Sequence, residues 1–368
     1  YTAIVKFILF GHCNAIFYLD CIVFQRKHFT FGNYTMKTKL ILITLLALGV
    51  AGVFFTSCNN DLDIVAPYKD TTVVYCLIDL NDTVHYVRIH KAFLGADNAY
   101  EMAQYTDSFY HKNVLSVKLE RWKNNQLYGV INFTRDSSIA KDTGLFANTP
   151  NIIYKSESCN LLSADSKYRL VVRNSETGSV VTSVTQMIQP TLIANPSSGT
   201  INLYPGPFVI RIASGKYGKI YDIKARFNYI EQQKNNPNIT ENKSVVWNIT
   251  QVTTVSDAGS ELINYAVGKD DFYQFCKSSI KVDNNVVRYS GKLDFYFTAG
   301  DQAMYEYLRI NNASGVNASN GLLFTNIENG LGIFASRRTE ISLGKSMAGN
   351  SIGYLISGPL TSQLGFIQ

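Results

Sequence analysis

Several features that would identify a common class of site are missing from this sequence. It contains neither a glycine-rich phosphate loop nor a dinucleotide-binding fingerprint. Its six cysteines include no CxxC pair of the kind that binds zinc. No segment of about 20–50 residues is repeated, which argues against a solenoid or a propeller. The sequence therefore predicts no cofactor and no metal ion.

The net positive charge is small beyond the N-terminal end. The formal net charge is +6 at pH 7, but residues 1–57 hold five of the 34 lysines and arginines and only one of the 28 acidic residues. The remaining 311 residues therefore carry a net charge of +2. They contain no cluster of Lys and Arg that could follow a phosphate backbone, so we expect no nucleic-acid partner.

One stretch has the order of a secretory signal. Met36 and two lysines precede sixteen uncharged residues, Leu40–Phe55, and Thr56-Ser57-Cys58 follows. The apolar run is close to the length of about 7–15 residues found in signal peptides. It is shorter than the stretch of about 20 residues that a transmembrane helix needs. The alternative is an uncleaved anchor helix followed by a chance cysteine.

The four residues Phe55-Thr56-Ser57-Cys58 resemble the lipobox of Gram-negative lipoproteins, although Phe55 departs from the commoner leucine. In that family a diacylglycerol is linked to the cysteine and the peptide is cut just before it. The resemblance implies that Cys58 is lipidated. The basic flank stays in the cytoplasm, so everything after Cys58 would be exported. Two or three acyl chains, worth roughly 0.8 kcal/mol per buried methylene, would anchor the protein without a spanning segment.

The segment Tyr1–Thr35 contains no methionine and mixes apolar runs with charges. We interpret it as translated upstream sequence that is absent from the natural product. The alternative is a further membrane segment near Ala3–Phe24, but Lys6 and Asp20 lie inside it. The predicted organisation thus begins with upstream sequence at 1–35, a signal peptide at 36–57 and a tether at 58–69.

The next part of the chain has the pattern of β-hairpins. Runs rich in β-branched and aromatic residues flank short polar turns at 71–78 with 83–89, at 114–122 with 126–133, and at 168–172 with 179–185. Ala96–Thr106 is the first candidate for a helix. Three hairpins with little helix between them predict an antiparallel β-sandwich over residues 70–195.

A second β-rich domain is expected over residues 196–368, because the remaining length exceeds that of most single cores. Prolines and glycines between 190 and 206 mark a junction. Strand patterns follow at 208–212, 220–230, 244–255 and 286–297, with a polar loop at 234–243. Short helices are predicted at Asp270–Ser278 and Asp301–Arg309, the second with Asp301 as its N-cap.

The sequence contains one possible catalytic motif. Gly349-Asn350-Ser351-Ile352-Gly353 matches the G-x-S-x-G nucleophile elbow, which requires a later histidine, yet the last histidine is His111. We therefore expect a glycine-rich loop. Cys76, Cys159 and Cys276 allow one disulfide, but buried thiols are the simpler interpretation.

The other polar candidates have ordinary explanations. His85 and His90 lie five residues apart, so a regular strand would point them to opposite faces. Surface or edge positions are expected for these two and for His111. The pairs Asp61/Asp63 and Asp270/Asp271 lack the framing of a calcium loop. No residue is therefore predicted to be catalytic.

Two segments resemble uncharacterised outer-membrane lipoproteins of the Bacteroidetes type. They are Tyr168-Arg169-Leu170-Val171-Val172 and the stretch Asn326-Ile327-Glu328-Asn329-Gly330-Leu331-Gly332-Ile333-Phe334. The resemblance implies an immunoglobulin-like sandwich followed by a second β-rich domain, often beside a TonB-dependent outer-membrane transporter. Asn329-Gly330 favours a tight hairpin turn, and Gly332 a close approach of two backbones.

These observations favour a lipid-anchored outer-membrane protein with a binding, adhesion or transporter-accessory role and no catalytic activity. The ligand is left open. The alternative is a glycan-binding or glycan-processing enzyme of the cell envelope. The chain has 23 tyrosines, and exposed tyrosines bind proteins or sugars, although tyrosine also fills β-rich cores. The enzyme would need a tyrosine-lined groove with two carboxylates about 5–9.5 Å apart.

Overall fold

The computed structural model describes residues 71–92, 101, 103–142, 144, 147, 149–157, 162–312 and 324–368. They belong to one compact unit that spans Val65–Gln368. The upstream sequence, signal, tether, Cys58, Asp61, Asp63 and Cys159 lie outside the described residues. Predictions on those positions therefore stay predictions.

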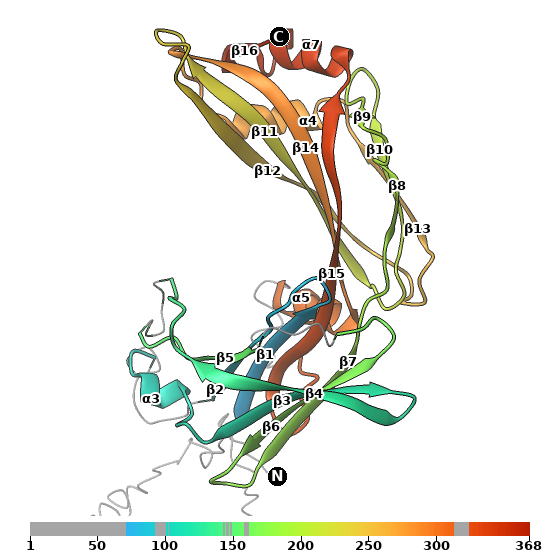
Figure 1. The fold of residues 1–368 in the computed structure, drawn as a ribbon. Coiled ribbons are helices and arrows are strands. Elements are labelled where there is room, and N and C mark those ends of the chain that lie inside the picture. Colours follow the sequence, from blue (N-terminus) through green and yellow to red (C-terminus); the bar gives the residue numbers. More distant parts are fainter. Residues whose placement is uncertain are drawn as a thin grey trace, which may run out of the picture. The chain divides into compact units, whose positions relative to one another are not determined.

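The fold is mainly β with a few short helices, as predicted (Figure 1). The first part holds β1 (Thr72–Asp79), β2 (Tyr86–Lys91), α3 (Thr106–Phe109), β3 (Leu115–Lys123), β4 (Gln126–Asp136), β5 (Ile153–Ser156), β6 (Lys167–Asn174) and β7 (Val180–Gln186). It is followed by β8 (Leu192–Asn195), β9 (Thr200–Ile201), β10 (Phe208–Ala213), β11 (Ile220–Gln233), β12 (Thr240–Thr253), β13 (Leu262–Val267) and α4 (Asp271–Ser279). The chain continues through β14 (Val286–Gly300), α5 (Gln302–Asn312), β15 (Leu331–Met347), α7 (Gly349–Ser357), a 3-10 turn (Ser362–Leu364) and β16 (Phe366–Ile367).

All three predicted hairpins are confirmed. β1 pairs antiparallel with β2, β3 with β4, and β6 with β7. The β3–β4 turn is the clearest case, because Lys123 faces Gln126 across two residues only. Those residues, Asn124 and Asn125, have φ values of 49° and 61°. Asparagine tolerates this left-handed conformation, which the tight hairpin turn requires.

One long strand joins segments that are far apart in the chain. The first part of β15 pairs parallel with β1, from Val73 beside Leu331 to Asp79 beside Arg337. Its second part pairs antiparallel with β14, from Gly300 beside Arg337 to Leu293 beside Lys345. Figure 1 shows β15 continuing from the neighbourhood of β1 to that of β14. The large sheet of the described residues is therefore mixed, whereas the hairpins predicted antiparallel pairing.

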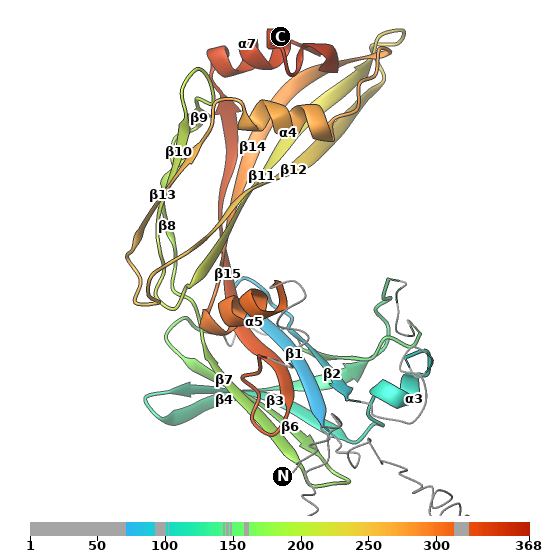
Figure 2. The same cartoon turned by 180° about the vertical axis from the view of Figure 1, so that it is seen from behind.

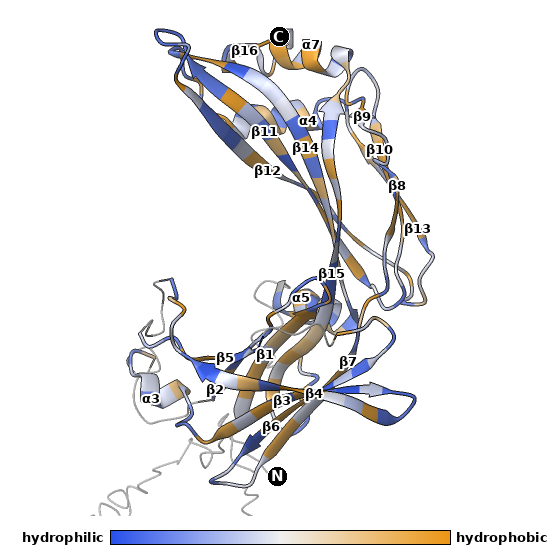
Figure 3. Cartoon of the chain, viewed as in Figure 1, coloured by the Kyte–Doolittle hydropathy of each residue, from blue (hydrophilic) through white to orange (hydrophobic). Residues whose placement is uncertain are grey.

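The described residues contain two main apolar cores. The first is built mainly from β1 to β7, and the second from Ile188 and the later strands together with α4 and α7. The chain passes from one to the other between Met187 and Ile188, just before the predicted junction. Ile327 and Phe334 then return to the first core from beyond residue 196. Apolar and polar residues alternate along β11 and β14, which is why those strands bury one face (Figure 3).

Two local predictions in the second part are wrong. The loop expected at 234–243 is shorter, because β11 runs to Gln233 and β12 begins at Thr240. The loop expected at Gly349–Gly353 is the start of α7. Leu355 of this helix is fully buried, with Ile352 and Ile356 packed against the same core. Burial of this apolar face outweighs the poor helix propensity of the two glycines.

The helices α4 and α5 are confirmed, and α4 lies against β12 (Figure 2). Asp301 is the N-cap of α5, since its Oδ1 accepts a hydrogen bond of 2.9 Å from the Met304 N–H. Part of the candidate at Ala96–Thr106 lies outside the described residues.

The turn at Asn329-Gly330 forms, with φ of 59° at Asn329. It does not close a ladder between neighbouring strands as expected. Instead, Glu328 forms a bridge to Thr182 of β7, and the residues after the turn pair with β1.

Candidate functional site

A groove of about 690 Å³ is lined by residues of β1, β2 and α5. Figure 2 shows where these three elements lie. Alternation along β1 buries Val74, Cys76 and Ile78 and turns Tyr75 and Leu77 outward. Strand register extends this face sideways, because Tyr75 lies beside Ile333 of β15 and beside Arg88 of β2. The groove is thus built by strands whose inner face forms the first core.

The lining is mostly apolar and aromatic. It includes Tyr75, Leu77, Tyr86, Ile139, Ile153, Ile333 and, from successive turns of α5, Met304, Tyr307 and Leu308. The side chains of Tyr75 and Tyr86 are 39% and 42% exposed. Burial, and then the neighbouring Tyr307, raise the pKa of Tyr75. The hydroxyl group of Tyr75 is therefore neutral and available for hydrogen bonding at physiological pH.

On one wall of the groove, Arg337 forms ion pairs with two acidic residues. Arg337 Nε lies 3.3 Å from Asp79 Oδ2, and another guanidinium nitrogen of Arg337 lies 3.4 Å from Asp82 Oδ2. Burial raises the pKa of Asp79, while the Asn81 backbone N–H and Arg337 act in the opposite direction. The two acids more than compensate Arg337, so this wall carries no excess positive charge.

Arg88 differs from Arg337 because it has no ion-pair partner among the described residues, although it lines the groove and is half-buried. The positive charge of Arg88 contributes to lowering the pKa values of two neighbouring groups. The pKa of Lys141 is lowered by burial and then by Arg88. The pKa of His90 is lowered to about 4 by burial, and then by Arg88, Lys141 and His111. The electrostatic potential around Arg88 is therefore positive.

Two further lining residues hold polar atoms without partners in the part of the chain described. His85 and Asn151 are only 2% and 4% exposed, and their atoms Nε2 and Oδ1 make no hydrogen bond there. Leaving such an atom unpaired costs roughly 1–3 kcal/mol. Buried, unpaired polar atoms beside a groove are typical of a site that receives hydrogen bonds from something else.

The prediction of surface histidines is wrong for His85 and His111, which are 2% and 8% exposed. His111 lies 3.5 Å from the Thr72 hydroxyl. His90 packs edge-on against Phe109 and Tyr110, with ring centroids 5.6 and 5.2 Å away. This aromatic packing of His90 joins residues that lie far apart in the chain, so single-sequence patterns do not reveal it. Nowhere in the described ranges do three His, Cys, Asp or Glu side chains gather as metal ligands would.

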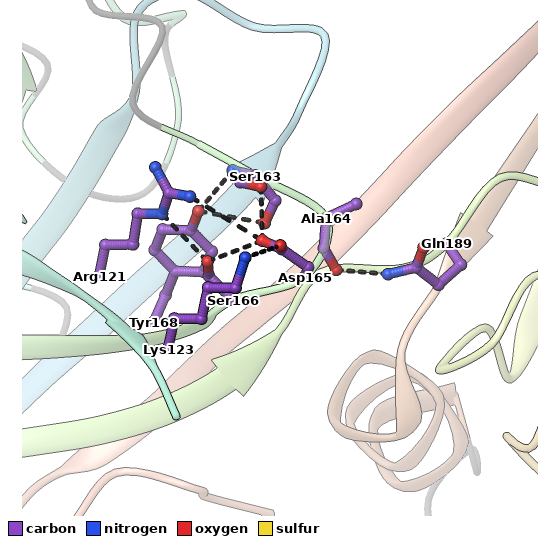
Figure 4. A network of polar contacts seen from close by, with 8 residues as sticks. All are labelled: Arg121, Lys123, Ser163, Ala164, Asp165, Ser166, Tyr168 and Gln189. Carbon is purple, nitrogen blue, oxygen red and sulfur yellow. Dashed lines mark hydrogen bonds and ion pairs between the residues drawn. The ribbon is translucent and has the colours of Figure 1, made fainter. Parts of the chain in front are cut away.

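A separate polar network surrounds Asp165 (Figure 4). Tyr168, fully buried at the start of β6, accepts a 2.5 Å hydrogen bond from the Ser163 N–H and donates one of 3.2 Å to the Ser163 carbonyl. Immunoglobulin-type sandwiches use a tyrosine in this way to hold the corner before a strand. The network therefore agrees with the predicted sandwich and has a structural role.

Asp165 itself is unsuited to acid catalysis. Its carboxylate accepts hydrogen bonds from Lys123, Ser163 and Ser166, at 2.5, 2.6 and 3.1 Å. Those bonds hold the pKa of Asp165 well below its usual range. The group is therefore ionised at neutral pH and cannot donate a proton there.

Ser351 of the G-x-S-x-G motif also has a structural role. It is fully buried, and its hydroxyl accepts hydrogen bonds from the N–H groups of Leu203 and Tyr204, at 2.8 and 3.2 Å. The same hydroxyl donates to Asn202 Oδ1 at 3.1 Å. These bonds join α7 to the segment at 202–204.

Cys76 and Cys276 are free, buried thiols, which confirms that interpretation for these two residues. Burial raises the pKa of both, so neither is a reactive thiolate at neutral pH. Of the acidic pair, Asp270 accepts a hydrogen bond of 3.1 Å from the Tyr354 hydroxyl, and Asp271 accepts one of 2.7 Å from the Gly268 N–H. Both acids thus hold local structure.

No family model and no curated protein sequence matches this chain. Among solved structures, the C-terminal globular domain of an oligosaccharyltransferase from Pyrococcus abyssi is similar at 11% identity and a TM-score of 0.22, over 60% of this chain and 45% of that one. CBD12 from CALX1.2 is similar at 8% identity and a TM-score of 0.16, over 67% and 89%. Similarities this low carry no argument about function. None of the described helices has both the length and the apolar character to cross a bilayer.

Proposed function

We propose that this protein is an exported lipoprotein of the bacterial outer membrane, anchored through acyl chains on Cys58, with a non-catalytic binding role. The observation that carries the proposal is the order of basic residues, apolar run and lipobox-like residues at 36–58. The mainly β exported part supports it, because a rigid β scaffold suits a surface that binds.

The groove next to α5 supports the binding part of the proposal. It combines exposed tyrosines, apolar side chains and an uncompensated arginine, which is the usual composition of a ligand site. A TonB-dependent outer-membrane transporter is the proposed partner on the resemblance alone. Copurification of such a transporter with the solubilised protein would support an accessory role, and its absence would favour an independent binding or adhesion role.

The anchor is tested by replacing its cysteine. Expressed in a Gram-negative host with labelled palmitate, the wild-type protein should carry label and sediment with membranes, whereas Cys58→Ala should lose the label and leave the membrane fraction. Cys76→Ala is the matched control, because its thiol is buried in the first core, and it should keep both properties. If Cys58→Ala stays in the membrane fraction without label, the protein is held by an uncleaved helix and not by acyl chains.

A glycan-processing enzyme is the second candidate, favoured by the exposed Tyr75 and Tyr86 in a groove that Asp82 also lines. Such an enzyme requires two carboxylates that act as general acid and as nucleophile or base, yet Asp79 and Asp82 both form ion pairs with Arg337. Hydrolysis of envelope glycans that is abolished by Asp82→Asn would favour this candidate over the first.

A further inference from the structure

The groove next to α5 contains one arginine, Arg88, that is not paired with an acid among the described residues. Its lining contains the charged residues Arg88, Arg337 and Asp82. Arg337 is compensated by Asp79 and Asp82, at 3.3 and 3.4 Å. Arg88 has no ion pair with any residue that the structure describes. A half-buried guanidinium without a counter-charge favours an anion, which it can bind through two parallel hydrogen bonds.

The rest of the groove would not suit a small inorganic anion. Leu77, Met304, Leu308 and Ile333 present apolar surface, and the rings of Tyr75 and Tyr307 continue it. Burying this surface against an apolar group is favourable by roughly 25 cal/mol per Å². Strand register places the two kinds of surface side by side, because Arg88 is the direct neighbour of Tyr75.

We propose that this groove binds a small amphiphilic anion, with a carboxylate-type head group on Arg88 and an apolar body along Tyr75, Leu77 and Leu308. His85 Nε2, which has no hydrogen-bond partner among the described residues, is a further donor to the head group in the tautomer that carries its proton there. A cation is disfavoured by Arg88, and a neutral sugar would leave the guanidinium uncompensated. The inference deepens the binding role proposed above and depends on it.

The test measures binding of octanoate by calorimetry, with the purified full chain in a non-ionic detergent and octanoate below its micelle-forming concentration. We expect Arg88→Gln to weaken octanoate binding about tenfold or more, since a hydrogen bond to a charged group is lost. Arg173→Gln is the matched control, because Arg173 is exposed on β6 and does not line the groove. Its affinity should equal that of the wild type.

Two ligand controls separate charge from apolar attraction. Octylammonium has the same chain with the opposite charge, and 1-octanol has the chain without charge. Both should bind the wild type at least tenfold more weakly than octanoate. Leu77→Glu should also weaken octanoate binding, because it places a negative charge on the apolar part of the same face. Unchanged thermal unfolding of each variant confirms that it is folded.

The proposal is overturned if the wild type does not bind octanoate, if Arg88→Gln binds it like Arg173→Gln, or if octylammonium or 1-octanol binds equally well. The assay uses purified protein, so its outcome is independent of where the protein is located. If octanoate does not bind, the proposed lipid anchor is unaffected. If Cys58 is not lipidated, the proposed octanoate site is unaffected.

Discussion

The Thr185 hydroxyl donates a hydrogen bond of 2.7 Å to Asp301 Oδ2, across 116 residues of sequence. The same carboxylate oxygen accepts a bond of 2.9 Å from the Ser336 N–H, and the other oxygen caps α5. One buried side chain thus connects β7, α5 and β15 at the place where β15 changes partner from β1 to β14. Loss of this carboxylate should affect stability more than loss of any exposed acid.

Replacing Asp301 with asparagine should lower the free energy of unfolding by about 2–4 kcal/mol. The amide keeps one acceptor oxygen and places an N–H₂ group among donors, so a charge-assisted bond is lost and a donor is left unpaired. Urea unfolding followed by circular dichroism measures the change. Asp257→Asn is the control, because Asp257 is exposed, and it should change stability by less than about 0.5 kcal/mol. Equal stability of the two variants would contradict this role of Asp301.

Replacing Gly332 with alanine should destabilise the protein by about 3 kcal/mol or more. Its φ is +107°, and an added Cβ would lie 2.0 Å from the Val74 carbonyl oxygen. This confirms the close backbone approach predicted at Gly332, which follows from the parallel pairing of β15 with β1. Gly129→Ala in β4 meets no atom within 4 Å and should be tolerated. Thermal unfolding of both variants tests the contrast, and similar melting temperatures would refute it.

Replacing Tyr168 with phenylalanine should cost about 1–3 kcal/mol. The ring keeps its place in the core, while the Ser163 N–H and carbonyl lose the hydroxyl partner that the structure gives them. The exposed Tyr128, at 59%, supplies the control Tyr128→Phe, which should be near neutral. Denaturant unfolding distinguishes the two. An equal effect on both would show that the corner hydrogen bonds contribute nothing.

His90 should make stability depend on pH. Its pKa in the folded state is about 4, below the value of about 6.5 of an unfolded histidine. Since the folded state binds the proton less tightly, this contribution is present above pH 6.5 and is lost as the pH falls towards 4, by up to about 3 kcal/mol. Arg88, Lys141 and His111 are the charged or titratable neighbours that add to burial.

The measurement for His90 compares unfolding free energies at pH 7.5 and 4.5. His90→Phe keeps an aromatic ring against Phe109 and Tyr110 and should show a smaller loss on acidification than the wild type. The same loss in both proteins would assign the pH dependence to other groups.

Much of the local structure follows from periodicity and turn chemistry. The two asparagines between β3 and β4 and the acidic N-cap at Asp301 act through atoms within a few residues, so they can be read directly. The prediction of a loop at Gly349–Gly353 was wrong because the deciding contacts are not local: α7 is stabilised by a core assembled from distant strands. His85 and His111 were placed on the surface because nothing nearby in the chain signals their burial.

The amino-acid order alone was sufficient for the β class, the three hairpins and the helices α4 and α5. Tertiary structure decided which strands lie side by side: Tyr75 acquires Ile333 on one side and Arg88 on the other, and Arg337 acquires Asp79. The groove exists only through those neighbours. Local patterns record which way a side chain faces, whereas the partner across a parallel strand pair lies more than 250 residues away and is selected by packing of the whole core.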